Sequence, residues 1–158
     1  RGECEKAAGL LGVKLLADLA LAAFEKKKGA LREGKLIERA RHVVSEIGRT
    51  KRAVEVLRTG DLAAFGALMN ESHPSLKVAY EVTGAPLDSL AAAAQAVPGV
   101  LGSRMTGAGF GGCTVSLVRE GAVAAFRSEV GARYARETGL KADFYVAGIG
   151  DGTKRVDG

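Results

Sequence analysis

The sequence predicts an α+β domain in which an antiparallel sheet is backed by helices and the first half of the chain is helical. Two observations predict it. Up to about residue 97, apolar side chains recur at steps of three and four, the period of an amphipathic helix. Beyond that point the period changes to an alternation around a glycine-rich loop, which indicates two strands. We expect one domain over residues 1–158, with a helical part over about 1–97 and a sheet-containing part over about 98–150.

The helical part divides at glycine and proline. Amphipathic spacing predicts a pair of helices around Cys4–Leu11 and Leu16–Lys27, followed by a long helix. Gly60 ends the long helix, and Asp61 can cap the next one by accepting a hydrogen bond from a free backbone N–H. A further short helix ends at Pro98. The apolar stripes of the long helix and of the helix after it comprise Ile37, Ala40, Val44, Ile47, Val54 and Leu57, then Leu62, Phe65, Leu68 and Met69.

The sheet-containing part has the predicted order strand, loop, strand, helix, strand. Val100–Met105 is short and extended in character, and Cys113–Leu117 alternates apolar with hydroxyl side chains. Helical spacing returns over Val123–Tyr134, and Asp143–Ile149 is the candidate for a final strand. We expect Cys113, at the start of the second strand, to be a small buried side chain rather than a reactive thiol.

Composition and charge exclude several classes of protein. The two cysteines lie far apart and form neither a disulfide framework nor a zinc pattern, so we expect a reducing, cytoplasmic location. No apolar run reaches the roughly 20 residues that a membrane span needs. The net charge is +5 with the excess in the first half, but acidic residues lie between the basic ones. A solvated helix face explains this charge better than a nucleic-acid surface does, so we predict no nucleic-acid and no membrane partner.

The most informative stretch is Gly102–Val115, where four glycines fall within six positions between two predicted strands. Glycine permits positive φ and close approach of the backbone to a ligand, and successive N–H groups can form an anion-binding concavity. Gly107, Gly109 and Gly112 match a GxGxxG pattern, but a dinucleotide-binding fold needs a helix after it and a strand follows here. Protein-kinase and P-loop signatures are absent from the sequence. A flexible hairpin is the plain alternative to a tight turn that approaches a ligand or another domain at Gly109.

Arg104–Cys113 resembles the third signature motif of galactokinases, within the GHMP small-molecule kinase superfamily. The resemblance extends over nearly the whole chain, in order and with similar spacing, which makes it far more specific than the glycine loop alone. It implies a GHMP-kinase C-terminal domain of ferredoxin-like type. The other stretches that resemble this family are Arg1–Glu5, Arg39–Val44, Gly60–Leu62, Gly66–His73, Thr138–Leu140 and Phe144–Val146.

The resemblance implies a complete enzyme that uses ATP and Mg²⁺ to phosphorylate the C1 hydroxyl of galactose or a related sugar. The family's catalytic Arg and Asp, its sugar-binding motif and its serine-rich phosphate loop belong to an N-terminal half that this sequence does not contain. We therefore expect no catalytic residue, no metal ligand and no bound cofactor in this chain alone, and the N-terminal half as its partner. The alternative is a non-catalytic sugar and nucleotide sensor that acts through a protein partner. The candidate site is the loop that closes over the active site, Thr106, Gly107, Ala108, Gly109, Phe110, Gly111 and Gly112.

Three further side chains have more than one interpretation. His73 precedes a proline, where bonding to the backbone at a helix end is favoured over a ligand site. His42 is expected to be packed or at the surface. Arg104 could reach a phosphate or an acidic partner at the loop mouth, or hold the loop through a carboxylate of the other half. The sequence departs from the family pattern at Val78 and Ala79, where two acidic residues are usual.

Overall fold

A computed structural model describes residues 2–148 and residue 150, and it confirms the α+β prediction with helices in the majority. The two strands form one antiparallel hairpin. No helix in the described part is both long and apolar enough to cross a membrane. In chain order the elements are α1 (Gly2–Leu10), η1 (Leu16–Asp18), α2 (Leu21–Lys27), η2 (Lys28–Ala30), α3 (Leu36–Arg58), α4 (Leu62–Pro74), the π-helix η3 (Ser75–Tyr80), α5 (Ala85–Gln95), β1 (Val100–Thr106), β2 (Cys113–Val118), η4 (Glu120–Ala122) and α6 (Val123–Thr138).

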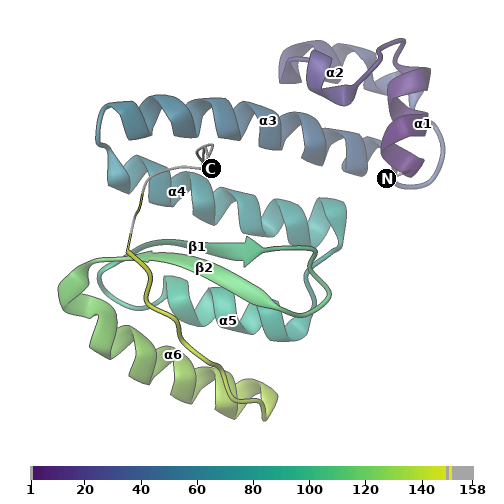
Figure 1. The fold of residues 1–158 in the computed structure, drawn as a ribbon. Helices are drawn as coiled ribbons and strands as arrows, with labels where there is room; N and C mark the ends of the chain where they lie inside the picture. The colour runs from purple at the N-terminus through teal and green to yellow at the C-terminus, as the bar shows by residue number, and fades with distance from the viewer. Residues whose placement is uncertain (1, 149, 151–158) are drawn as a thin grey trace, which may run out of the picture.

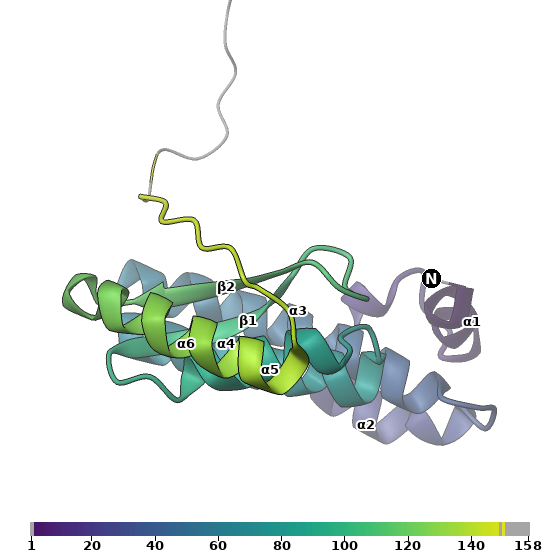
Figure 2. The ribbon, with the colours of Figure 1, turned by 90° about the horizontal axis from the view of Figure 1, so that it is seen from below.

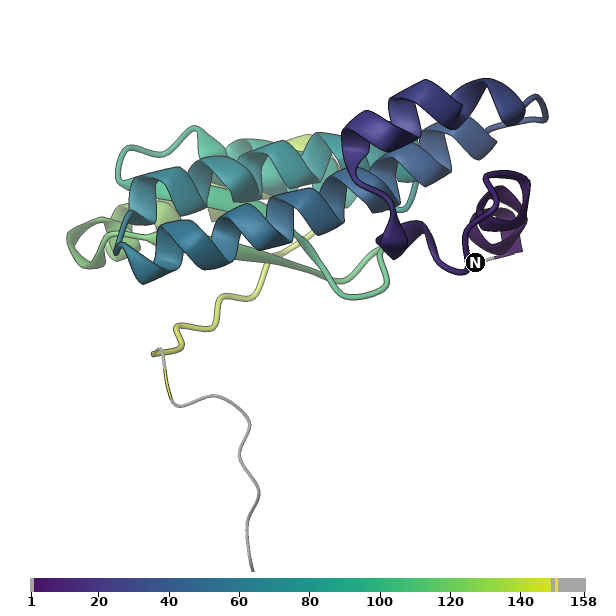
Figure 3. The ribbon, with the colours of Figure 1, turned by 90° about the horizontal axis from the view of Figure 1, so that it is seen from above.

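The elements stack in layers. Figure 1 shows α3 and α4 side by side, the β1–β2 hairpin beneath α4, and α5 and α6 beneath the hairpin. Seen from above, α2 lies against the first part of α3 (Figure 3), and seen from below, α5 and α6 lie next to each other (Figure 2). In all three views the tip of the hairpin lies at the same end of the molecule as α1.

The helix boundaries follow local signals where capping groups are present. Gly60 adopts φ 72°, and Oδ1 of Asp61 accepts the N–H of Ala64 at 2.9 Å, so the predicted stop and cap are confirmed. The predicted single helix over Leu16–Lys27 is wrong, because the chain is extended between η1 and α2. There the carboxylate of Asp18 accepts the N–H of Leu15 at 3.0 Å and closes a short turn instead of a helix.

The core is divided among several clusters rather than centred on one. The largest joins α1, η1 and α2 to the first half of α3 and includes Phe24, which is fully buried. On α3 itself, Ala40 and Val44 are buried as the spacing predicts, but Val54 and Leu57 are 43% and 47% exposed. The apolar stripe of α3 therefore extends beyond the helices that cover it. Near the C-terminal end of α3, no described element buries Val54 and Leu57.

α4 lies along the edge of β1 that is turned away from β2, and two glycines allow the backbones to meet. A Cβ on Gly66 would lie 2.2 Å from the carbonyl oxygen of Leu101, and a Cβ on Gly102 would lie 2.3 Å from the carbonyl oxygen of Gly66. Real Cβ contacts do not come so close, so glycine is required at both positions.

Side chains take the place of a neighbouring strand along this edge. The N–H of Ser103 donates to Oδ1 of Asn70 on α4 at 2.8 Å, and its carbonyl accepts from Nε2 of Gln95 on α5 at 2.8 Å. The Ser103 side chain is fully buried, and buried backbone groups without partners are strongly destabilising. Helices therefore close the β1 edge that would otherwise be open for strand pairing.

The buried face of the sheet is the one that carries Ser103, Met105 and Ser116. Met105 packs with Leu87 of α5, and the hydroxyl oxygen of Ser103 lies 2.8 Å from that of Ser116 across the hairpin. Residues alternate between faces, so Cys113 falls on the opposite face and is exposed. The prediction of a buried Cys113 is wrong because the alternation was assigned to the wrong face.

The prediction of a final strand is also wrong over residues 143–148, and Ile149 lies outside the described residues. This segment is extended, but among the described residues no strand lies beside it to form a ladder. Phe144 still packs edge-on against Phe126 of α6, with the two ring centroids 5.8 Å apart, whereas Tyr145 is 91% exposed. The segment thus keeps one side chain packed against α6 although its backbone has no strand partner among the described residues.

The contact between α4 and β1 can be tested with alanine. We expect Gly66→Ala to lower the free energy of unfolding by about 3 kcal/mol, because the added methyl group overlaps the backbone of Leu101. Gly48→Ala is the matched control, since Gly48 lies inside α3 with no atom within 4 Å of the new Cβ. It should leave stability unchanged or raise it by up to about 1 kcal/mol. Urea denaturation followed by circular dichroism measures both, and equal effects would refute the close contact.

Candidate functional site

The glycine loop joins β1 to β2 as a tight turn built on left-handed backbone. Gly107, Gly109, Gly111 and Gly112 have φ values of 83°, 86°, 117° and 105°, and Phe110 has a φ of 59°. The predicted tight turn with several positive φ values is therefore confirmed. Phe110 is the one non-glycine residue of the loop with a left-handed backbone conformation, and its side chain is 79% exposed. A bulky residue held in this conformation is strained, and such strain gathers at functional sites.

The tip of the loop is fixed to the segment between η3 and α5. The N–H of Phe110 donates to the carbonyl oxygen of Val82 at 2.8 Å, and a Cβ on Gly109 would lie 2.0 Å from that same oxygen. The close approach expected at Gly109 thus involves Val82 of the same chain. Within the part of the chain that the structure describes, this is the loop's one backbone hydrogen bond outside the β1–β2 ladder, which leaves most of its N–H groups open to a ligand.

The base of the loop is fixed at Met105, the residue before Thr106. The N–H of Met105 donates to Nδ1 of His73 at 3.1 Å, so the preferred role for His73, a bond to backbone, is confirmed. The carbonyl of Met105 accepts from Nε of Arg104 at 2.9 Å. Four side chains thus hold the outer edge of β1 at Ser103 and Met105. We call them the edge clamp, namely Asn70, His73, Gln95 and Arg104.

The ring of His73 is buried, with an exposed fraction of 7%, and it has a charged neighbour on its other side. Nε2 lies 3.2 Å from Oδ1 of Asp88 on α5, and Oδ2 of Asp88 lies 3.1 Å from Nζ of Lys77. Burial lowers the pKa of His73 below its usual range, and Asp88 opposes the shift only in part. The neutral ring accepts at Nδ1, so its proton belongs on Nε2, facing Asp88.

Arg104 continues this polar arrangement toward α3. Its guanidinium lies 3.9 Å from Oε2 of Glu46, which also accepts a hydrogen bond from Ser72 at 2.7 Å and pairs with Arg49. Of the two roles predicted for Arg104, an acidic partner is present, but it comes from this chain. The Arg104 side chain keeps an exposed fraction of 34%, so part of it still faces solvent near the loop.

A second set of contacts positions Val82. Arg39 of α3 donates to the carbonyl oxygen of Ala79 and to Glu81, both at 2.5 Å. Glu81 adopts φ 57° at the end of the π-helix η3 and also pairs with Lys35. π-Helices are rare and are often found at functional sites. Here the extra winding and the left-handed residue turn the chain so that Val82 meets the loop.

His42 lies in the same region and is buried. Its Nδ1 is 2.8 Å from the hydroxyl of Ser75, and its ring stacks on Tyr80 with centroids 4.5 Å apart. Burial, together with the positive charge of Arg49, lowers the pKa of His42 to about 4. His42 is therefore a packed, neutral residue, one of the two roles expected for it.

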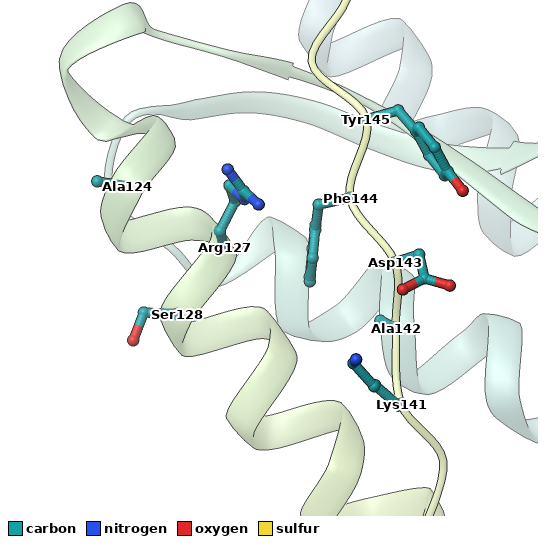
Figure 4. A pocket seen from close by; sticks show the side chains of 8 residues that line it. All are labelled: Ala124, Arg127, Ser128, Lys141, Ala142, Asp143, Phe144 and Tyr145. Carbon is teal, nitrogen blue, oxygen red and sulfur yellow. The ribbon is translucent and has the colours of Figure 1, made fainter.

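Away from the loop, the surface is hollowed between α6 and the segment after it. Figure 4 shows Arg127 of α6 near this groove, with Lys141 and Asp143 across from it. The residues that line the groove include none of the glycine loop. Nor do the described residues contain a group of three His, Cys, Asp or Glu side chains that could hold a metal ion. The glycine loop with its two anchors thus remains the candidate site.

Comparison with known proteins agrees with this architecture. The family model described as GHMP kinases C terminal matches residues 53–136. The chain belongs to the GHMP kinase family. It is 49% identical to galactokinase from Fusobacterium nucleatum and 48% identical to galactokinase from Enterococcus faecalis, in both cases over 99% of this chain and 41% of the relative. The chain thus spans less than half the length of these curated relatives.

Among solved structures, the fold matches that of Lactococcus lactis galactokinase complexed with galactose. The TM-score is 0.92 at 46% sequence identity, over 96% of this chain and 40% of the other. The resemblance to galactokinases noted in the sequence is therefore confirmed, as is its restriction to the C-terminal portion of a GHMP kinase.

Part of the site was not foreseen in the sequence. The sequence assigned no role to Asn70 or Gln95, although Gly66, Asn70 and His73 follow the spacing of one helix face. A small residue followed by two hydrogen-bonding side chains on one helix face is the signal that could have indicated a helix lying along a backbone. No comparable local signal in the sequence indicates that Val82 anchors the tip of the loop.

The anchor at Val82 predicts different effects at two glycines of nearly equal φ. Gly107→Ala and Gly109→Ala both place a Cβ on left-handed backbone, at a cost of about 1 kcal/mol each. Only the Cβ of Gly109→Ala overlaps a neighbour, the carbonyl oxygen of Val82. We expect Gly109→Ala to release the Phe110 amide from protection against hydrogen exchange, measured by NMR, while Gly107→Ala leaves it protected. Protection of this amide in both variants would contradict the anchor.

Proposed function

We propose that this chain is the C-terminal part of an ATP-dependent sugar kinase that phosphorylates the C1 hydroxyl of galactose, and that it supplies the glycine loop to the active site. The observation that carries the proposal is the collinear likeness to galactokinases over 99% of the chain, loop included. The solved Lactococcus lactis relative is a complex with galactose, which supports this sugar as the substrate.

The loop's geometry supports a role beside the phosphates. Thr106 and the residues up to Gly112 present backbone N–H groups that the chain itself leaves largely unused. Phosphoryl transfer relies on positioning and on charge stabilisation, and preorganised N–H donors provide both without rearrangement. The loop is held at its base by Met105 and at its tip by Val82, so its donors are set in advance.

ATP and Mg²⁺ fit this chain to different degrees. The open N–H groups of the loop suit phosphate oxygens, so Gly107, Ala108 and Gly111 are the residues that we assign to ATP. Bound Mg²⁺ would neutralise charge on the transferring phosphoryl group. We assign it no ligand here, because the described residues offer no suitable cluster of side chains.

We infer further that the sugar site, the catalytic base and the metal ligands lie in an N-terminal half outside these 158 residues. That N-terminal half is the partner of this chain. Two features support the inference. The curated relatives are more than twice as long, and the outer edge of β2 has no strand beside it in the described part. The glycine loop lies at the same end of the molecule as α1 (Figure 1), the first helix of this chain.

The division of labour can be tested directly. The isolated 158-residue chain should release no ADP above background with galactose and Mg-ATP, whereas the full-length protein should turn over, and a mixture of the two separately expressed parts should recover some activity. A coupled ADP-release assay measures all three. Galactose-dependent turnover by the isolated chain would refute the proposal, and a full-length protein that binds galactose and ATP without turnover would point to a sensor.

A further inference from the structure

The two anchors of the glycine loop belong to one stretch of the chain. His73 holds Met105 at the base of the loop, and Val82 holds Phe110 at its tip. His73 is the penultimate residue of α4, after which the helix passes through Pro74 into the π-helix η3 and then to Val82. A change in how His73 binds β1 therefore acts on the base of the loop and on the segment that carries its tip.

His73 differs from the other members of the edge clamp in one respect. The side chains of Asn70 and Gln95 do not titrate and that of Arg104 keeps its charge, whereas an imidazole ring can lose its ability to accept. The contact with Met105 exists only while the ring is neutral and Nδ1 is the unprotonated nitrogen. The negative charge of Asp88, whose Oδ1 lies 3.2 Å from Nε2, favours a proton on that nitrogen and so favours this tautomer.

We propose that His73 is a positioning residue for the glycine loop: its neutral ring, with the tautomer set by Asp88, holds the N–H of Met105 and so determines where the loop leaves the sheet. The other charged groups around the ring are Lys77 on η3, which pairs with Asp88, and Arg104 on β1, which also faces Glu46 of α3. Neither cation can replace the ring as an acceptor for the N–H of Met105.

Burial supports the neutral state of the ring. It lowers the pKa of His73 below the ordinary value of 6.5, and the two cations Lys77 and Arg104 lower it further, against the pull of Asp88. The contact with Met105 is therefore complete above pH 6.5 and is lost as the pH falls through the lowered value. Once Nδ1 carries a proton, it faces the N–H of Met105 as a second donor.

Two substitutions separate the two sides of the ring. In His73→Asn the amide oxygen can take the place of Nδ1 and still accept from Met105, whereas in His73→Gln the longer side chain reaches toward Asp88 and leaves that N–H without an acceptor. The chain's other histidine gives the matched control. His42→Gln removes a contact to Ser75 and the stacking on Tyr80, both in η3, but it removes no contact to β1, so the N–H of Met105 keeps its acceptor.

The first measurement is hydrogen exchange by mass spectrometry on the full-length protein that carries this chain, and it does not depend on activity. We expect His73→Gln to speed exchange over residues 105–112 by about tenfold, the effect of one lost hydrogen bond, with His73→Asn and His42→Gln close to the wild type there. Equal exchange in His73→Gln and His73→Asn would overturn the proposal. If His73→Gln does not fold, Asp88→Asn decides, because it frees the tautomer and should still raise exchange over the same residues.

The second measurement is turnover, and it rests on the proposed function. We expect His73→Gln to lower kcat about tenfold with KM for galactose within about twofold, because the loop acts on the transferring group rather than on the bound sugar. In the wild type, kcat should fall on the acid side as the ring protonates, and His73→Asn should shift this limb to lower pH. An unshifted acid limb would overturn the proposal. A wild type without kinase activity would refute the proposed function alone, since the exchange result stands by itself.

Discussion

The closure of the β1 edge by helices is the constraint on which the rest of the fold depends. A strand has outward-facing N–H and C=O groups along both edges, and buried groups of this kind need partners. β1 receives them on one side from β2 and on the other from side chains of α4 and α5. These bonds form only if α4 comes into backbone contact with β1, which Gly66 and Gly102 allow. One helix is thereby set in position and direction against the sheet.

The position of α4 in turn fixes the surroundings of the glycine loop. Since α4 runs along β1, its C-terminal end arrives beside the base of the loop, where His73 contacts Met105. The π-helix that follows carries the chain around to the loop's tip, and Arg39 of α3 stabilises that turn through Ala79 and Glu81. A loop of four glycines would have high conformational entropy if left free. Two anchors from one segment leave it a narrow range of positions.

The proposed function accounts for an ordered loop whose neighbouring charged side chains pair with one another. The described residues near the loop form ion pairs among themselves, such as Glu46 with Arg49 and Asp88 with Lys77, and these pairs hold structure. A chain that spans 41% of its relatives can carry one wall of an active site without carrying the reacting groups. Under the proposed function, the chain contributes a preorganised surface that the edge clamp positions.

What the sequence by itself determined were the features set by near neighbours along the chain: the helix stop at Gly60, the cap at Asp61, the two strands, and the left-handed turn of the glycine loop. What only the tertiary structure decided were the features set by distant partners. Cys113 is exposed because α5 covers the other face of the sheet, and residues 143–148 form no strand because no described strand lies beside them. Asn70 and Val82 became site residues only once α4 and the chain after η3 met the hairpin. Periodicity indicates which face of a helix or strand is apolar and which is polar. Which neighbour each face contacts depends on residues far apart in the sequence.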